Sequence, residues 1–370
     1  MESTCLHALS ISKKAFDSIW HVGLLHKLRN NRVTGKVYNI IKAIYTNSTG
    51  CVKVKNGLTN TFPIEKGIRQ GDGLSPLLFN IYLNDIKSHI NASHNDLPTL
   101  LNNQLPCLLY ADDLLLLSET NTGLQNAINS LQLYCHKWKL EININKSKTI
   151  IFNKAGRRLD KYNFFINQDV LERVTSYTYL GKNLNTTGKL EKAQVDLKNK
   201  ALKACFKMNQ LLFSATCTML RIHLKMFDAV VRPILLYCTE IWSSDIIAHT
   251  KQLWNLTTPM EKLHTKFCKF LLKVNSRASN LPCLIELGRY PLTIQGTKQL
   301  LKYWMRVQEM PENTLVCEAY KLGIKMHDSG TKNWISGVKK ILENLNLSNI
   351  WKDGQIKYNN ATIENITEKT

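Results

Sequence analysis

Residues 105–117 have the sequence LPCLLYADDLLLL, in which two adjacent carboxylates, Asp112 and Asp113, stand between two apolar runs. Each run has the length and composition of a buried β-strand, so the sequence predicts a hairpin with the aspartates at its tip. One interpretation is an ordinary turn, because aspartate favours turns. The other is a metal site, because like charges between core strands are costly to hold together without cations, and hard divalent cations take oxygen ligands.

A glycine-rich loop, KGIRQGDG, lies upstream of this hairpin over residues 66–73. Gly71 and Gly73 would let another backbone or a base pair approach closely. Arg69 and Gln70 would bring hydrogen-bond donors to the same loop. The alternative is an ordinary connection between a strand and a helix.

The pattern of apolar residues changes near residue 186. Before that point it predicts helices and short strands, at 19–46, 51–64 (a hairpin), 123–139, 149–152 and 177–180. After it the pattern is helical, over 189–213, 219–242 with Pro233 as a kink, 259–274 and 294–310. We therefore expect an α+β unit over residues 1–186 and an all-α unit over residues 187–370.

The charge is strongly positive and uneven. The chain has 49 Lys and Arg against 28 Asp and Glu, a net charge of +21, of which residues 1–150 carry +6, 151–300 carry +13 and 301–370 carry +2. This excess predicts a polyanionic partner, either nucleic acid or an acidic membrane surface. Two rows of lysines at helical spacing are candidates for contacts with a phosphate backbone, although such a row can also be a merely solvated helix face. The first row is Lys200, Lys203 and Lys207. The second, on the helix expected over 259–274, is Lys262, Lys266, Lys269 and Lys273.

The ten cysteines are scattered through apolar stretches without a CxxC motif, which favours reduced thiols in an intracellular protein without a disulfide-linked partner. His264 and Cys268 share a helical face, but without two further ligands nearby a metal site there is the less favoured interpretation. The chain has neither a signal-peptide pattern nor an apolar run of about 18 residues, so we expect no membrane association.

Several segments of the chain together resemble successive motifs of the reverse transcriptases of non-LTR (LINE-type) retrotransposons, in order and in spacing. They are SKKAFDSI (12–19), RQGDGLSPLLFNIYLNDI (69–86), LLYADDLLLLSE (108–119), WKLEININKSKTIIF (138–152) and YTYLG (177–181). Two later segments resemble the basic region that follows the polymerase in these elements: VVRPILLYCTEIW (230–242) and LPCLIELGRYPL (281–292). The resemblance implies a right-hand polymerase palm, an antiparallel sheet with packed helices, over residues 1–186. A basic, all-α thumb and connection would follow over residues 187–370.

The resemblance also implies roles for individual residues. Asp112 and Asp113 would be the palm carboxylates that hold Mg²⁺ in a two-ion site, and Lys146 would lie near the leaving pyrophosphate. Phe16 would lie under the incoming sugar and select deoxynucleotides. The remaining implied positions are the template–nucleotide pocket (Arg69, Gln70, Gly71) and the primer grip (Tyr179, Leu180, Gly181). The implied partners are an RNA template, a DNA primer and deoxynucleoside triphosphates.

The chain departs from the family at its start. The first catalytic aspartate of the palm would stand four residues before Ala15, where this chain has Ile11, which cannot bind a metal. The fingers that precede this point in the family are also missing, so we expect a truncated polymerase with one metal ligand absent and little synthesis by this chain alone. The alternatives are an inactive relic that at most binds nucleic acid, and a basic helical scaffold unrelated to polymerases.

Overall fold

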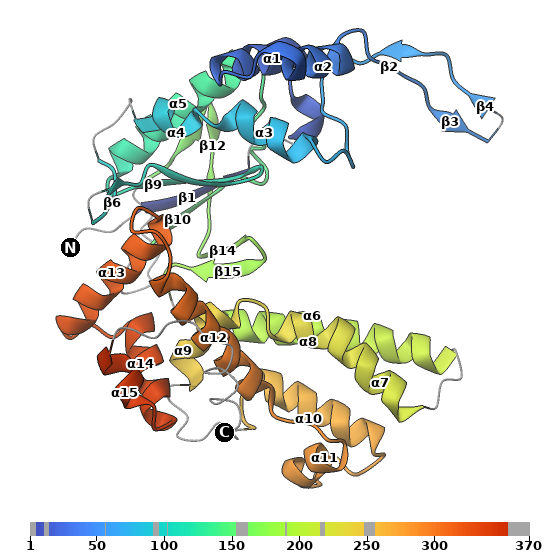
Figure 1. Cartoon of the computed structure of the whole chain (residues 1–370), viewed down its shortest axis with the longest axis vertical. Helices are drawn as coiled ribbons and strands as arrows, with labels where there is room; N and C mark the ends of the chain where they lie inside the picture. Colours follow the sequence, from blue (N-terminus) through green and yellow to red (C-terminus); the bar gives the residue numbers. More distant parts are fainter. Residues whose placement is uncertain are drawn as a thin grey trace. The chain divides into compact units, whose positions relative to one another are not determined.

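The computed structural model describes residues 5–10, 15–55, 57–91, 96–101, 103–152, 162–188, 191–214, 219–247 and 256–353. The chain divides into two compact units, residues 1–188 and 189–370 (Figure 1). The first contains helices and strands, whereas the elements described in the second are all helices.

A five-stranded sheet forms the centre of the first unit, with the strand order β13-β10-β1-β9-β8. The strands are β1 (Cys5–Ser10), β8 (Cys107–Tyr110), β9 (Asp113–Ser118), β10 (Lys148–Ile151) and β13 (Glu172–Arg173). Every neighbouring pair is antiparallel except β10 and β13, which run parallel, so the sheet is mixed rather than purely antiparallel as expected. In the register, Asp113 pairs with Tyr110 on one side and with Ser10 on the other.

Strand β9 is apolar because both of its faces are covered. Leu114 and Leu116 belong to the main core of the unit. Leu115 and Leu117 face the opposite side and pack against Tyr177 and Tyr179. Since successive side chains of a strand point to opposite faces, burial on both sides requires the unbroken run of leucines.

Helices cover the main core side of the sheet. They are α1 (His21–Asn30), α2 (Gly35–Tyr45), α3 (Ser75–Leu83), α4 (Ile86–Asn91) and α5 (Asn121–Lys137), with a short 3₁₀ turn over Phe16–Ser18. The Thr120 side chain caps α5 by accepting a hydrogen bond from the Gly123 amide at 3.0 Å. The helix expected over 19–46 is two helices, because the chain turns at Arg32, whose φ is +60°.

The remaining strands form short ribbons. They are β2 (Thr49–Gly50) with β5 (Phe62–Pro63), β3 (Lys53–Val54) with β4 (Gly57–Leu58), β6 (Thr99–Leu100) with β7 (Asn103–Gln104), β11 (Phe165–Ile166) with β12 (Asp169–Val170), and β14 (Ser176–Tyr179) with β15 (Lys182–Asn185). Strands β2 to β5 make a ribbon that extends away from α2 (Figure 1). This ribbon is the hairpin expected over 51–64.

The second unit contains α6 (Glu191–Ser214), α7 (Leu220–Met226), a π-helical turn (Phe227–Val231), α8 (Arg232–Leu235), α9 (Thr239–Ile247), α10 (Pro259–Leu271), α11 (Asn280–Glu286), α12 (Leu292–Gln308), α13 (Leu315–Asp328), α14 (Trp334–Asn344) and α15 (Ser348–Asp353). The expected single helix over 219–242 is wrong. Pro233 lies in the first turn of α8, where its missing N–H costs nothing. The chain instead breaks after α8, at Cys238, whose φ is +56°.

The lysine face predicted for the helix over 259–274 is wrong at its C-terminal end. Helix α10 ends at Leu271, and Lys273 follows it with a φ of +54°. Lys273 therefore lies beyond the helix rather than on its lysine face.

Among the described residues, no helix is long and apolar enough to cross a membrane.

Candidate active site

The hairpin between β8 and β9 holds Asp112 and Asp113 at the end of the sheet. Tyr110 pairs with Asp113, so Ala111 and Asp112 form a two-residue turn, and Ala111 has a φ of +52°. Both aspartates are half-buried. Burial and the neighbouring Asp112 charge raise the pKa of Asp113 above its usual value, while the Lys146 ammonium acts in the opposite direction. Two carboxylates therefore lie together at the tip of a hairpin between apolar strands, as the sequence predicted.

Two further segments approach the same carboxylate. Strand β1 ends at Ser10, directly opposite Asp113. The next position, Ile11, lies outside the described residues. Burial, and then the Asp113 charge, raise the pKa of Tyr177 and of Tyr179 on β14. Tyr177 was not among the predicted site residues. It is two residues from Tyr179 on the same strand, so both side chains lie on one face, and this spacing could have pointed to Tyr177 as well.

The side chains at the tip suit a hard divalent cation. Asp112 and Asp113 supply carboxylate oxygens, and Mg²⁺ in enzymes is often bound through one or two carboxylates together with substrate phosphates. Within the described part of the chain, no group of three or more His, Cys, Asp or Glu side chains could hold a metal. The hairpin tip therefore offers two carboxylates as candidate ligands.

Residues 66–73 form a loop tied to the segment that contains Phe16. The amide of Ile68 donates to the Phe16 carbonyl at 2.8 Å, and the amide of Gly67 donates to the Ile19 carbonyl at 2.8 Å. Gly67 has a φ of +94°, and a Cβ there would come within 3.0 Å of the Asp17 carbonyl oxygen. This position requires glycine for both reasons.

Side chains extend the same connection. Gln70 donates to the Asp17 carboxylate at 2.9 Å, and the Phe16 ring stacks on Phe79 with the ring centroids 4.5 Å apart. The buried Ser75 hydroxyl donates to the Arg69 carbonyl at 2.5 Å, which anchors the loop to the start of α3. The structure therefore brings Phe16, Arg69 and Gln70 into one group, with Arg69 and Gln70 exposed.

Gly71 lies in this loop with a φ of +86° and open space where a side chain would begin. The predicted primer-grip residues lie in a different turn. Tyr179 pairs with Lys182, so Leu180 and Gly181 form the two-residue turn between β14 and β15, with φ of +46° and +77°. Positive φ at both central residues is the signature of a type I′ hairpin.

The predicted nucleic-acid lysines of the second unit fall into two groups. Lys200, Lys203 and Lys207 on α6, and Lys262 and Lys266 on α10, are exposed. Lys269 is half-buried and donates to the Ser276 carbonyl at 2.8 Å, so this side chain holds the chain segment that follows α10. The face expected to carry four lysines therefore carries two fully exposed ones on the helix.

His264 has two hydrogen-bonding neighbours, and six of the described cysteines are buried. His264 lies between Arg289, which donates to its Nε2 at 3.2 Å, and Glu261, whose Oε2 is 3.4 Å from Nδ1. The eight cysteines that the structure describes are free thiols. Burial raises the pKa of Cys107 to about 11 and that of Cys135 to about 12, so these thiols are protonated at neutral pH.

Comparisons with known proteins agree on the family. Residues 3–184 match the family model of reverse transcriptases (RNA-dependent DNA polymerases). The RNA-directed DNA polymerase from the mobile element jockey of Drosophila funebris is 26% identical over 330 residues, which cover 86% of this chain and 33% of that protein. The retrovirus-related Pol polyprotein from the type-1 retrotransposable element R2 of Nasonia vitripennis is 29% identical over 187 residues, 48% of this chain and 18% of that protein.

Among solved structures, apo telomerase of Candida tropicalis aligns with all of this chain and 54% of its own, at 13% identity and a TM-score of 0.42. The chain spans about a third of the length of the jockey protein. The motif series, the family model and the relatives all lead to one assignment. Residues 3–184 match the reverse transcriptase family, and the relatives of the chain include RNA-directed DNA polymerases of non-LTR retrotransposons.

Proposed function

We propose that this chain catalyses RNA-directed DNA synthesis on a primer, as the polymerase part of a non-LTR retrotransposon protein. The observation that carries the proposal is the hairpin tip, where Asp112 and Asp113 lie together at the end of a buried strand, with Lys146 close enough to offset part of their charge. In this proposal residues 1–186 are the palm, and residues 187–370 are the thumb and connection.

Asp112 and Asp113 would hold Mg²⁺, with Asp112 the principal ligand. When bound there, Mg²⁺ would stabilise the negative charge that develops on the attacking and leaving oxygens as a primer 3′-hydroxyl is joined to the α-phosphate of a nucleotide. Lys146 is exposed, so its ammonium is free to approach the leaving pyrophosphate.

Phe16, Arg69, Gln70 and Gly71 would bind the nucleotide and the template base. The stacking on Phe79 holds the Phe16 ring in one orientation, as a side chain that selects against a 2′-hydroxyl requires. The Gln70–Asp17 hydrogen bond positions the exposed loop beside that ring. Glycine at position 71 leaves room for a base pair to approach the backbone. Tyr179, Leu180 and Gly181 would contact the primer strand.

The exposed lysines of α6 and α10 would contact the phosphates of the template–primer duplex. Lys200, Lys203 and Lys207 stand opposite a core-facing stripe that includes Ala201, Cys205 and Met208, so the lysine face of α6 is free for a ligand. Binding through such contacts weakens with salt as condensed counterions are released.

A second candidate function, binding of nucleic acid without synthesis, is favoured by Ile11. Strand β1 leads directly to this position, since its last residue, Ser10, pairs with Asp113. The family has a third metal-binding carboxylate at the equivalent of position 11. An isoleucine there leaves the site short of one ligand and one negative charge.

Primer extension separates the two functions. The test compares the wild-type chain with Ile11→Asp, the uncharged control Ile11→Asn, and Asp113→Asn, on a DNA primer annealed to an RNA template with Mg²⁺ and deoxynucleotides. We expect Ile11→Asp to raise the extension rate on the order of 100-fold, as restoring a metal ligand should. Ile11→Asn should not raise it.

Adding Asp113→Asn to Ile11→Asp should return extension to background. If neither the wild-type chain nor Ile11→Asp extends the primer, although both bind it in a fluorescence anisotropy assay, the proposed synthesis is wrong and the binding function stands.

A further inference from the structure

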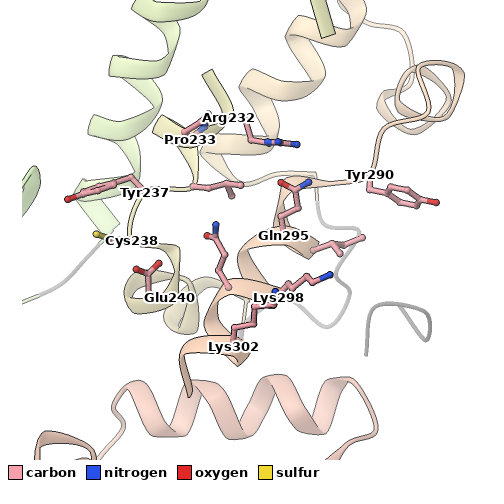
Figure 2. Close-up of a pocket in the computed structure, with 12 residues that line it drawn as sticks. Arg232, Pro233, Tyr237, Cys238, Glu240, Tyr290, Gln295, Lys298 and Lys302 are labelled. Atoms are coloured by element: carbon pink, nitrogen blue, oxygen red, sulfur yellow. The ribbon is translucent and has the colours of Figure 1, made fainter. Parts of the chain in front are cut away.

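A cleft in the second unit lies apart from every residue assigned so far. It has a volume of about 900 Å³ and lies between the segment around α8 and α9 and the helix α12 (Figure 2). A second cavity, of about 490 Å³, shares Glu240, Gln299 and Lys302 with it and extends it along α12. The two cavities are therefore adjacent along this helix, and together we call them the groove.

The groove carries an excess of positive charge in a regular row. Lys298, Lys302 and Arg306 recur every four residues, so they lie on one face of α12, about 6 Å apart along its axis. Arg232 from α8 also lines the groove but is paired with Asp228 at 3.3 Å, and the acidic lining residues are Glu240 and Glu309. Lys298 and Lys302 form no ion pair with a carboxylate anywhere in the described part of the chain.

Aromatic rings accompany this row of cations. Tyr237 and Tyr290 lie at opposite ends of the cleft and are 43% and 70% exposed (Figure 2). Tyr303 lines the continuation of the groove, where the Arg306 guanidinium lies 5.4 Å from the centre of its ring. Exposed tyrosines beside unpaired cations are what a strand of stacked bases on a phosphate backbone requires.

The walls of the groove are held rigidly. The Thr239 hydroxyl donates to the Gln299 side-chain oxygen, which links α9 to α12. The Trp334 indole donates to the Glu240 carbonyl at 2.9 Å. Next to Tyr290, Arg289 binds both carboxylate oxygens of Asp228, at 2.7 and 2.8 Å. A site built on such fixed elements loses little conformational entropy when it binds a ligand.

We infer that this groove binds a single-stranded segment of nucleic acid, with phosphates on Lys298 and Lys302 and an unpaired base stacked on Tyr290. The ligand is single-stranded because stacking on a side chain needs a free base face, which a duplex does not offer. The inference does not depend on the synthesis proposed for the first unit, since it uses none of those residues.

The test measures binding of a labelled oligonucleotide to the full chain by fluorescence anisotropy over a series of salt concentrations. Unstructured RNA and DNA oligonucleotides of equal length serve as probes, with a duplex and poly-glutamate as competitors. The variants are Lys298→Gln/Lys302→Gln, Tyr290→Ala and Tyr290→Phe. The matched control is Lys325→Gln/Lys332→Gln, which removes two exposed lysines outside the groove. Circular dichroism verifies that each variant is folded.

Loss of two phosphate contacts should lower the slope of log K against log salt by about 1.4, while the control leaves the slope unchanged. Tyr290→Ala should weaken binding roughly 5- to 100-fold, and Tyr290→Phe should retain most of the affinity, because the ring rather than the hydroxyl stacks. A photocrosslink from the oligonucleotide should map to the peptide that contains Tyr290.

Three results would overturn the inference: equal competition by the duplex or by poly-glutamate, crosslinks confined to residues 1–188, or the same slope in the groove variant and the control. A preference for RNA over DNA, or the reverse, identifies the natural strand.

Discussion

Two sites, one in each unit, treat buried charge in opposite ways. In the second unit, Glu261 and His264 are fully buried, yet each has a partner. Glu261 accepts from the Thr293 amide at 2.8 Å, and Arg289 joins His264 to Asp228. In the first unit, the half-buried carboxylates of Asp112 and Asp113 stand side by side, and the nearby Lys146 ammonium offsets only part of the effect of burial and of the Asp112 charge on Asp113.

This difference indicates which charges are structural. A buried polar network whose members satisfy one another stabilises a particular packing, and removing one member leaves the others unpaired. A carboxylate pair that the protein leaves largely uncompensated costs stability until a cation binds, which is expected of a functional site. Neutralising a charge should therefore have opposite effects on stability at these two sites.

The largest effect is expected in the second unit. Arg289→Met should lower the free energy of unfolding by about 3–5 kcal/mol, because it leaves Asp228 with only Arg232 and His264 without its donor. Urea denaturation measures this change, and Arg277→Met, at an exposed arginine, is the control. Equal stability of the two variants would mean that the network contributes nothing.

At the hairpin tip the sign should reverse. Asp113→Asn should leave the free energy of unfolding unchanged or raise it by less than about 1 kcal/mol in the absence of divalent cations, because it removes a repulsion at a partly exposed site. The same urea titration in EDTA measures it. A loss of stability comparable to that of Arg289→Met would contradict the comparison.

A compensated carboxylate within the first unit should behave like the network of the second unit. Burial alone would raise the pKa of Asp85, but the hydrogen bonds from Lys27 and Tyr134 and the Lys27 charge hold it below its usual value. Such a carboxylate contributes stability above its unfolded pKa of about 3.9 and loses that contribution as the pH falls through its folded pKa.

Asp85→Asn should therefore be less stable than the wild-type chain at pH 6, and the difference should shrink as the pH is lowered below about 4. Thermal unfolding between pH 6 and pH 3 measures this. A difference that stays constant over this range would show that the ion pair with Lys27 contributes nothing through Asp85.

Local features were predictable from the sequence where apolar periodicity and turn chemistry agree. The hairpin around Asp112 follows from its two apolar runs, and helix α5 (Asn121–Lys137) lies within two residues of the predicted range of 123–139. The end of α10 was not predictable, since Lys273 adopts the left-handed conformation that glycine usually provides, so the sequence holds no stop signal there.

Contacts between distant segments were beyond such reasoning. Gln70 and Asp17 are 53 residues apart, and Arg289 and Asp228 are 61 apart. No periodic pattern in the sequence links the two residues of either pair. The resemblance to a family implied that Phe16 and Gln70 both lie near the nucleotide, and backbone hydrogen bonds between residues 16–19 and 67–68 hold their two segments together.

The central claim is that Asp112 and Asp113 are a carboxylate pair completed by a divalent cation. The most direct measurement is the melting temperature of the full chain with and without 10 mM Mg²⁺, compared with the double variant Asp112→Asn/Asp113→Asn. For a dissociation constant near 1 mM, binding should stabilise the wild-type chain by about 1.4 kcal/mol and raise its melting temperature by a few degrees. The account predicts this rise in the wild-type chain and none in the double variant; an equal rise in both, or none in the wild type, would contradict it.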